Sequence, residues 1–300
     1  MNNSTQYCYE IAAPPTSGLY YSLRKIPADK RAVVVAIHAF YREIENIIFE
    51  CHDPQLALVK FNWWRTEITK SSNHPVLSIL QSLSALVGAD PCVRPDVLVE
   101  AAGRTHGSAP TKADKLRDDV CANRLEKMLD GFQQIIIPTP FATFEEVVIQ
   151  WMRTAGEREL LIHEILNTEK IVTEEVIYQL MLVIELVNYI QHLRHYTRHH
   201  VIYFPQDEME RFGVTAEMLS EYVTTESIKN LLHYQVEKIL RAYAVVGALS
   251  REQKVALRPL LVRCEMARAT LRAIQESDFK VLENWINLTP LRFWWIAFNC

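Results

Sequence analysis

The chain has 300 residues, of which 49% are hydrophobic and 23% charged, with a net charge of −4 and a pI near 6.2. Only 8 residues are glycine, so the composition favours a compact globular fold over a low-complexity chain. Nucleic acid is not an expected partner, because neutralising phosphates requires a concentrated basic surface.

The expected elements are helices, since apolar residues recur at helical spacing nearly everywhere and period-2 alternation is almost absent. Pro27 and Asp29 suit the first turn of the first long helix, and Thr143 can cap a later one. The expected ranges, in chain order, are 28–51, 54–68, 76–87 (closed by Gly88), 95–102, 113–129, a helix starting after Thr143, 173–197, 225–249, 251–276 and 278–287.

No linker divides the chain and no period of 20 to 50 residues repeats, so a solenoid is not expected. We therefore predict a single all-α domain of about ten helices over residues 17–300, preceded by an N-terminal segment over 1–16.

Six scattered cysteines without C-x-x-C spacing favour reduced thiols in a cytoplasmic protein. Residues 1–10 lack the pattern of a secretory signal, and no uncharged apolar stretch reaches the roughly 18 residues of a transmembrane span. The aromatic stretch 293–298 has two interpretations, a docked C-terminal segment or a peripheral contact with a membrane.

Several motifs then follow one another in the order typical of a known family. They are Ala39-Phe40-Tyr41-Arg42-Glu43, Trp64-Arg65-Thr66-Glu67, Thr143-Phe144-Glu145-Glu146, Ala155-Gly156, and the block from Ile202 to Val214. In this order the chain resembles the squalene/phytoene synthase family from Ser17 to about Ala297. The resemblance implies the isoprenoid-synthase fold, with helices around a central apolar cavity.

The family reaction, head-to-head condensation of two prenyl diphosphates, implies Mg²⁺ ions held by aspartates on two facing helices. The resemblance places the first three aspartates at Glu45, Asn46 and Phe49. On the second helix it places two aspartates at His195 and His199. Only Glu45 keeps a carboxylate, so we expect these degenerate positions to offer too little oxygen ligation for the reaction.

Basic and amide residues are better preserved than the acids. Arginine binds diphosphate through paired hydrogen bonds without a metal. The predicted substrate-binding residues are Tyr41, Arg42, Asn188, Gln191 and Arg194. The alternative is that the arginines form structural ion pairs with Glu43, Glu45 and Glu185.

His195 and His199, with His192 before them, also have the spacing of a helical transition-metal site. Imidazole favours Zn²⁺ over Mg²⁺, so the candidate metal ligands are Glu45, His195 and His199. The alternative is a solvated, histidine-rich helix end.

Two functional interpretations follow. The first is a pseudoenzyme of this family that binds an isoprenoid diphosphate or a lipid, or that acts through a protein partner. It would resemble the branch that assembles mitochondrial respiratory complex I and lacks the aspartates. The second is a divergent prenyltransferase of isoprenoid biosynthesis that makes a squalene- or phytoene-like product with Mg²⁺.

Overall fold

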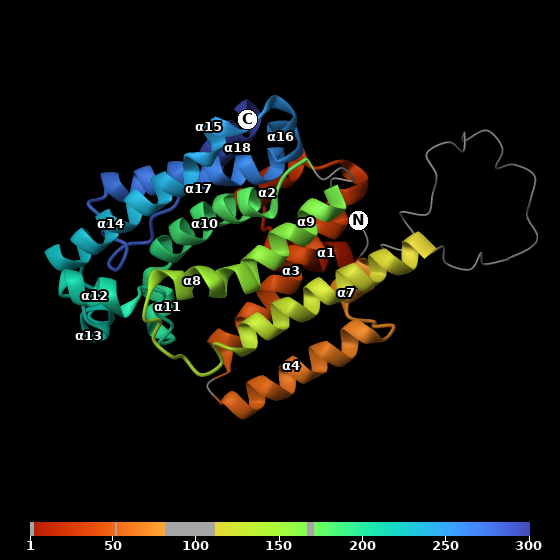
Figure 1. Ribbon diagram of the computed structural model, residues 1–300, viewed down its shortest axis with the longest axis horizontal. Coiled ribbons are helices and arrows are strands. Elements are labelled where there is room, and N and C mark those ends of the chain that lie inside the picture. The colour runs from red at the N-terminus through yellow and green to blue at the C-terminus, as the bar shows by residue number, and fades with distance from the viewer. Residues whose placement is uncertain (1–2, 52, 82–111, 167–170) are drawn as a thin grey trace, which may run out of the picture.

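The computed structural model describes residues 3–51, 53–81, 112–166 and 171–300, and this part of the chain is helical, without a strand (Figure 1). Its α-helices are α1 Asn3–Ala12, α2 Gly18–Ser22, α3 Ala28–Glu50, α4 Pro54–Thr69, α5 Pro75–Gln81, α7 Lys112–Gln133, α8 Phe144–Trp151, α9 Glu157–Leu166, α10 Glu174–Gln191, α11 Leu193–Arg198, α12 Gln206–Phe212, α13 Ala216–Ser220, α14 Glu226–Tyr243, α15 Val245–Ala248, α16 Arg251–Ala256, α17 Arg258–Glu276 and α18 Pro290–Asn299. A 3₁₀ turn, Leu23–Lys25, precedes α3, and a π-helical turn, Met152–Gly156, joins α8 to α9.

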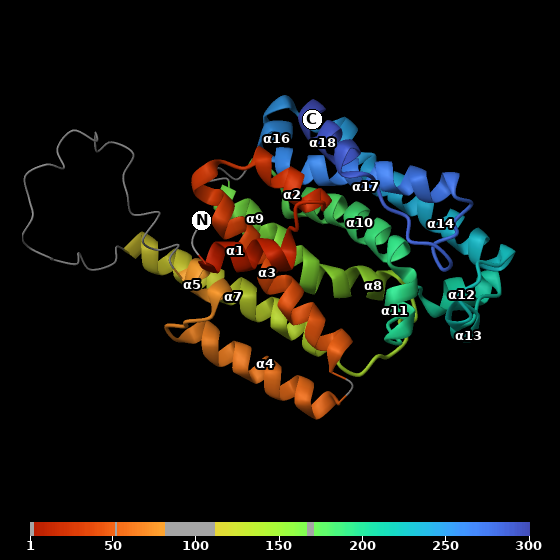
Figure 2. The same ribbon diagram turned by 180° about the vertical axis from the view of Figure 1, so that it is seen from behind.

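Helix α3 lies at the centre of the molecule. It packs against α1, α5, α7 and α9, while α10 packs against α14 and α17 on the other side of the interior. Seen from behind, α4 lies at one edge of the molecule and α18 near the opposite edge (Figure 2). The all-α prediction is confirmed.

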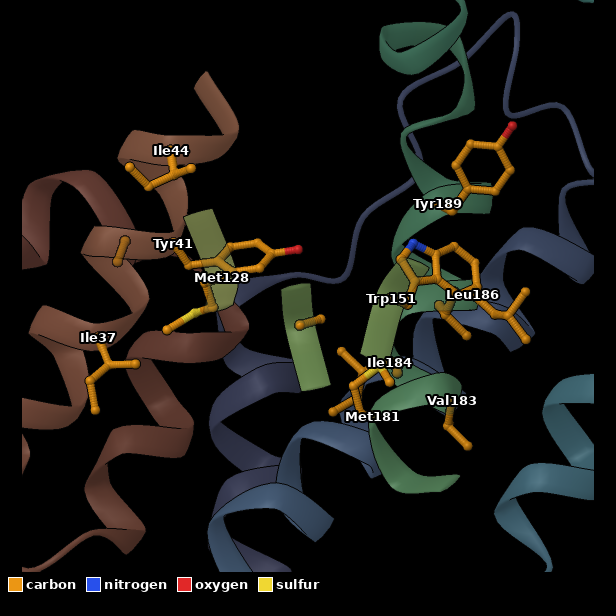
Figure 3. Packing of buried hydrophobic residues seen from close by; sticks show 14 of the residues in the cluster. Ile37, Tyr41, Ile44, Met128, Trp151, Met181, Val183, Ile184, Leu186 and Tyr189 are labelled. Atoms are coloured by element: carbon orange, nitrogen blue, oxygen red, sulfur yellow. The ribbon is translucent and has the colours of Figure 1, made fainter. Parts of the chain in front are cut away.

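The hydrophobic core joins α3 to α10 through side chains at helical spacing (Figure 3). In Figure 3 the labelled core residues are Ile37, Tyr41 and Ile44 of α3, Met128 of α7, Trp151 of α8, and Met181, Val183, Ile184, Leu186 and Tyr189 of α10. Gly131 allows α7 to approach the π-helical turn closely, because an added Cβ would lie 2.6 Å from the Arg153 carbonyl oxygen.

Most predicted helix starts are confirmed by their local chemistry. The Thr143 hydroxyl accepts a hydrogen bond from the Glu146 amide at 3.5 Å, as an N-cap does. Asp53 caps α4 in the same way through the Gln55 amide at 2.8 Å. Helix α3 ends at Glu50, one residue from the predicted end.

Several predicted helices differ from the structure. The helix expected over 173–197 breaks at His192, whose ψ of 17° ends α10 before α11 begins. The helix expected over 251–276 breaks at Leu257, and Pro259 stands in the first turn of α17. The helix expected over 225–249 ends at Tyr243 and resumes as the short α15.

The helix predicted over 278–287 is wrong. Asp278 and Phe279 have φ values of 59° and 58°, which reverse the chain after α17. Phe279 is buried and Asp278 pairs with Lys229 of α14, so tertiary contacts support this conformation. Conversely, α1 and α18 are helices that the sequence interpretation did not identify. The expectations for residues 82–88 and 95–102 lie outside the described residues.

Candidate active site of an isoprenoid-synthase fold

A cavity of about 560 Å³ lies between α3, α10 and α17. Of the residues singled out from the sequence, it is lined by Tyr41, Arg42, Glu45, Asn46, Phe49, Asn188, Gln191, His192 and His195. Its volume lies in the range of pockets that hold one small molecule. The structure therefore brings both predicted helix faces to one site.

Glu45 is the carboxylate preserved on the first face, and it is engaged by two neighbours. Its Oε2 atom accepts a hydrogen bond from Arg42 Nη1 at 2.6 Å, and Oε1 accepts one from the Tyr196 hydroxyl at 3.3 Å. The Glu45 charge is the main cause of the raised pKa of Arg42. Glu45 is only 7% exposed, and its hydrogen bond with Tyr196 links α3 to α11. The alternative of structural ion pairs thus holds for Arg42 with Glu45, whereas Glu43 accepts a hydrogen bond from the Tyr7 hydroxyl.

Phe49 occupies the place between the two faces where a third aspartate was expected. Its ring centroid lies 4.7 Å from that of His195, 5.3 Å from that of Tyr196 and 5.3 Å from that of His199. These are the distances of tilted and edge-to-face aromatic packing. Of this aromatic cluster, Phe49, His195 and Tyr196 line the cavity.

The second face begins with two amides. Gln191 donates from Nε2 to the Ile286 carbonyl at 2.8 Å, which fixes its side chain. His192 Nδ1 lies 2.9 Å from the Asn188 carbonyl, and its ring packs on Trp285 with centroids 4.7 Å apart. Burial lowers the pKa of His192 and that of His195, so both rings are neutral at pH 7.

A buried network of charged side chains lies at the cavity, and the sequence interpretation missed it. Arg158 lies 2.7 Å from Glu185 and 2.8 Å from Glu159, and Arg263 bonds both oxygens of Glu159. Burial raises the pKa of Glu159, but Arg263 and Arg158 outweigh it, and the net pKa lies below the usual value. The sequence signal for this network was the presence of charged residues within apolar helices. Among these residues, the sequence interpretation singled out only Glu185.

Two further groups face this network. Arg158 lies over the Tyr41 ring at 4.2 Å from its centroid, a cation–π contact. His38 is buried beside the cavity, and its pKa falls well below 6.5 because of desolvation and the charges of Arg263, Arg158 and Arg42. The lining of the cavity therefore includes these polar groups as well as the apolar side chains of Ile184, Val187, Met266 and Phe293.

Arg194 and His199, both predicted site residues, are not among the residues that line the cavity. The Arg194 guanidinium lies 4.9 Å from the Tyr222 ring centroid, and Nη1 donates to the Glu283 carbonyl at 3.4 Å. His199 contacts two residues that line the cavity, through its ring packing on Phe49 and on His195. Glu185 pairs with Arg158, a partner that the sequence interpretation did not name.

The donor set does not fit Mg²⁺. Within the described residues, no three His, Cys, Asp or Glu side chains are grouped as a metal site requires. Glu45 is held by Arg42 and Tyr196, and the opposite wall offers imidazoles, which are poor Mg²⁺ ligands. For Zn²⁺, the rings of His195 and His199 lie 4.8 Å apart, but Glu45 does not complete a set of three with them.

Helices around a cavity are the arrangement expected of an α-helical protein of the isoprenoid-synthase class. A family model described as squalene/phytoene synthase matches residues 15–295. The chain therefore belongs to the squalene/phytoene synthase family.

Phytoene synthases of Mycobacterium bovis and Mycobacterium tuberculosis are each 26% identical to this chain over 205 residues. The match covers 68% of this chain and 58% of the length of either relative.

Two solved structures share the fold. A dehydrosqualene synthase in complex with ligand superposes with a TM-score of 0.72 at 15% identity, covering 99% of this chain and 95% of that one. Squalene synthase HpnC from Alicyclobacillus acidocaldarius gives 0.65 at 13% identity, covering 92% and 94%. The predicted isoprenoid-synthase fold is confirmed.

Proposed function

We propose that this protein is a non-catalytic member of its family, which binds one isoprenoid diphosphate or phosphate-bearing lipid in the cavity without Mg²⁺. The observation that carries the proposal is the aromatic cluster of Phe49, His195 and His199. It stands where condensation needs carboxylates on two opposed walls, and it offers no hard oxygen ligand. No step of the condensation is therefore derived for this site.

The same cavity keeps groups that suit an anionic head. Arg42, Arg158 and Arg263 line it together with two carboxylates, Glu45 and Glu185. Arg42 is the most accessible of these cations, with 51% of its side chain exposed. A diphosphate can bond the outward-facing nitrogens of Arg42 while Nη1 remains on Glu45, because a guanidinium carries five N–H donors. The apolar residues Ile184, Val187 and Met266 would contact the hydrocarbon tail.

The direct test is calorimetric titration with farnesyl diphosphate, in the presence of Mg²⁺ and in the presence of EDTA. We expect saturable binding with the same affinity under both conditions. Arg42→Gln should weaken it about tenfold, since a hydrogen bond to a charged group contributes about 1.5–3 kcal/mol. Arg65→Gln is the matched control, because Arg65 pairs with Asp130 and does not line the cavity. Absence of binding under both conditions would refute the cavity role.

A parallel assay addresses the prenyltransferase alternative. The protein is incubated with farnesyl or geranylgeranyl diphosphate, Mg²⁺ and NADPH, and the extract is analysed for C30 or C40 hydrocarbons. We expect none above a protein-free control. A hydrocarbon product that disappears in Arg42→Gln would establish the alternative and reject the proposal.

Action through a protein partner is a second candidate, supported by α4. Leu56, Val59 and Trp63 stand at i, i+3 and i+7 on this edge helix and are 50%, 64% and 45% exposed. Val59→Gln with Trp63→Gln should leave farnesyl diphosphate binding unchanged. In cells that lack the native gene, the double variant should then fail to restore function. Full restoration would remove this candidate.

A further inference from the structure

Helix α18 is apolar on two faces. Its inner face, with Phe293 and Ala297, is buried against α2 and α17. Its outer face carries Leu291, Trp294, Trp295 and Phe298 at i, i+3, i+4 and i+7, and these are 72%, 38%, 59% and 66% exposed. A surface helix normally turns polar residues to water on that side.

The rings on this outer face form one surface. The Trp294 ring stacks on Phe298, with centroids 5.5 Å apart and an interplanar angle of 18°, and Trp295 lies beside Trp294 at 6.4 Å. Indole combines an apolar body with one N–H donor, so tryptophan is favoured at the boundary between lipid and water.

Cations lie on α18 and on segments near it. Arg292 is exposed on α18 itself, and Arg258 Nε donates to the Cys300 carbonyl at 3.0 Å, next to the end of the helix. Glu265, which pairs with Arg268, and Lys25 both lie near enough to act electrostatically on the Cys300 thiol, and Arg24 lies over Tyr20 and Tyr21 of α2, which packs against α18. In the part of the chain that the structure describes, Arg24, Lys25 and Arg292 form no ion pair with a side-chain carboxylate, whereas Arg258 is already bonded to the main-chain oxygen of Cys300.

We propose that the outer face of α18 docks on an anionic lipid bilayer, with the helix axis in the plane of the membrane surface. Exposed tryptophan, phenylalanine and leucine on one face with arginine and lysine at its border are typical of interfacial helices. Each cation near an anionic leaflet contributes about 1 kcal/mol. The helix lies on the membrane and does not cross it; no helix of the described residues is long and apolar enough to do so.

A second copy of the chain fits this face less well. In a symmetric dimer the same patch meets itself, so the cations at its border would approach those of the partner. An anionic membrane can bury the apolar rings and attract the cations at the same time. The docked orientation would also place the cavity beside the bilayer, because Phe293 of α18 lines that cavity.

Vesicle flotation with the full-length chain tests the proposal. The vesicles are phosphatidylcholine alone, or phosphatidylcholine mixed with phosphatidylserine. We expect the protein to float with the mixed vesicles, at least tenfold more than with phosphatidylcholine alone. Trp295→Gln with Phe298→Gln should reduce flotation by roughly tenfold or more, since burial of each large apolar side chain contributes about 1.5–3 kcal/mol. Arg292→Glu with Lys25→Glu should reduce it comparably at low salt.

Trp63→Gln is the matched control, because it removes an exposed tryptophan from α4 at the opposite edge of the molecule (Figure 2). Circular dichroism verifies that each variant is folded, and farnesyl diphosphate titration in solution separates this proposal from the cavity function. Failure of the native chain to float with mixed vesicles would overturn the proposal. So would equal loss in the Trp63→Gln control, or a dimer in solution that Trp295→Gln dissociates.

Discussion

Phe49 of α3 and His195 of α11 face each other with their ring centroids 4.7 Å apart and their planes at 64°. This contact joins the two walls at the place where the family chemistry needs acidic residues on both. Packing between rings thus stands where the resemblance led us to expect a pair of charged ligands.

Restoring acids at this contact should create magnesium affinity. We expect the double variant Phe49→Asp, His195→Asp to gain about 1.4 kcal/mol in free energy of unfolding at a Mg²⁺ concentration tenfold above its dissociation constant. The native chain should show no gain at that concentration. The readout is urea denaturation with MgCl₂ against matched NaCl, and His200→Asp, on an exposed turn, is the control. An equal response in the control would mean that the two walls do not form a site.

Removing the partner of Arg42 should strengthen anion binding. Glu45→Gln deletes the carboxylate charge that now holds Arg42 Nη1 at 2.6 Å. Farnesyl diphosphate should then bind roughly tenfold tighter, because the guanidinium no longer divides its charge between two anions. Calorimetry measures the change, with Glu50→Gln as the control, since Glu50 is exposed and does not line the cavity. Weaker binding in Glu45→Gln would place the anion elsewhere.

The buried charge network should be sensitive to the loss of a single member. Glu159→Gln leaves Arg158 and Arg263 with one carboxylate fewer, and we expect it to cost about 3–5 kcal/mol of unfolding free energy. Glu226→Gln removes one end of a surface pair whose glutamate side chain is 83% exposed, so it should cost at most about 1 kcal/mol. Urea denaturation at pH 7 compares the two. Similar costs would show that the buried network is not held by Glu159.

Acid should destabilise the fold through its buried histidines. The pKa of His38 lies well below 6.5 in the folded chain, so near pH 6 the unfolded chain binds more protons than the folded one. Stability is thus fully present above pH 6.5 and falls as the pH drops, by up to about 1.4 kcal/mol per pH unit for each such histidine. His38→Gln should flatten the dependence below about pH 6.5, where the imidazole of the unfolded chain takes up a proton that the buried imidazole does not.

Burial is also the largest cause of the lowered pKa of His192, so His192 adds to the slope of stability against pH. Glu159 acts in a separate window, because its pKa lies below 4.5 and its contribution is lost only at lower pH. His200→Gln, at an exposed position, is the control for the histidine substitution. An unchanged slope in His38→Gln would show that other groups cause the acid sensitivity.

Local signals in the sequence predicted the long helices well. Thr143 and Asp53 accept hydrogen bonds from nearby amides, which the sequence alone can indicate. The break at His192 could not be predicted, because no proline or glycine marks it. The reversal at Asp278 and Phe279 depends on the burial of the Phe279 ring and on the ion pair with Lys229, both distant in sequence.

The site was predictable where it followed one helix face. Arg42, Glu45 and Phe49 share a face of α3 and line the cavity together. Arg194 does not line it, because the chain changes direction at His192 and its guanidinium meets Tyr222. The pairing of Arg263 with Glu159 joins residues 104 positions apart, which single-sequence periodicity does not detect.

The tie from Glu45 to Arg42 and Tyr196, next to the packed ring of Phe49, has a consequence for how the two walls meet. Opposed clusters of carboxylates repel one another until a cation enters between them. Here the rings are uncharged and Arg42 compensates the charge of Glu45, so the two walls do not repel each other. The contact between the two walls is therefore expected to be independent of the divalent-ion supply of its surroundings, and to persist in the presence of chelators.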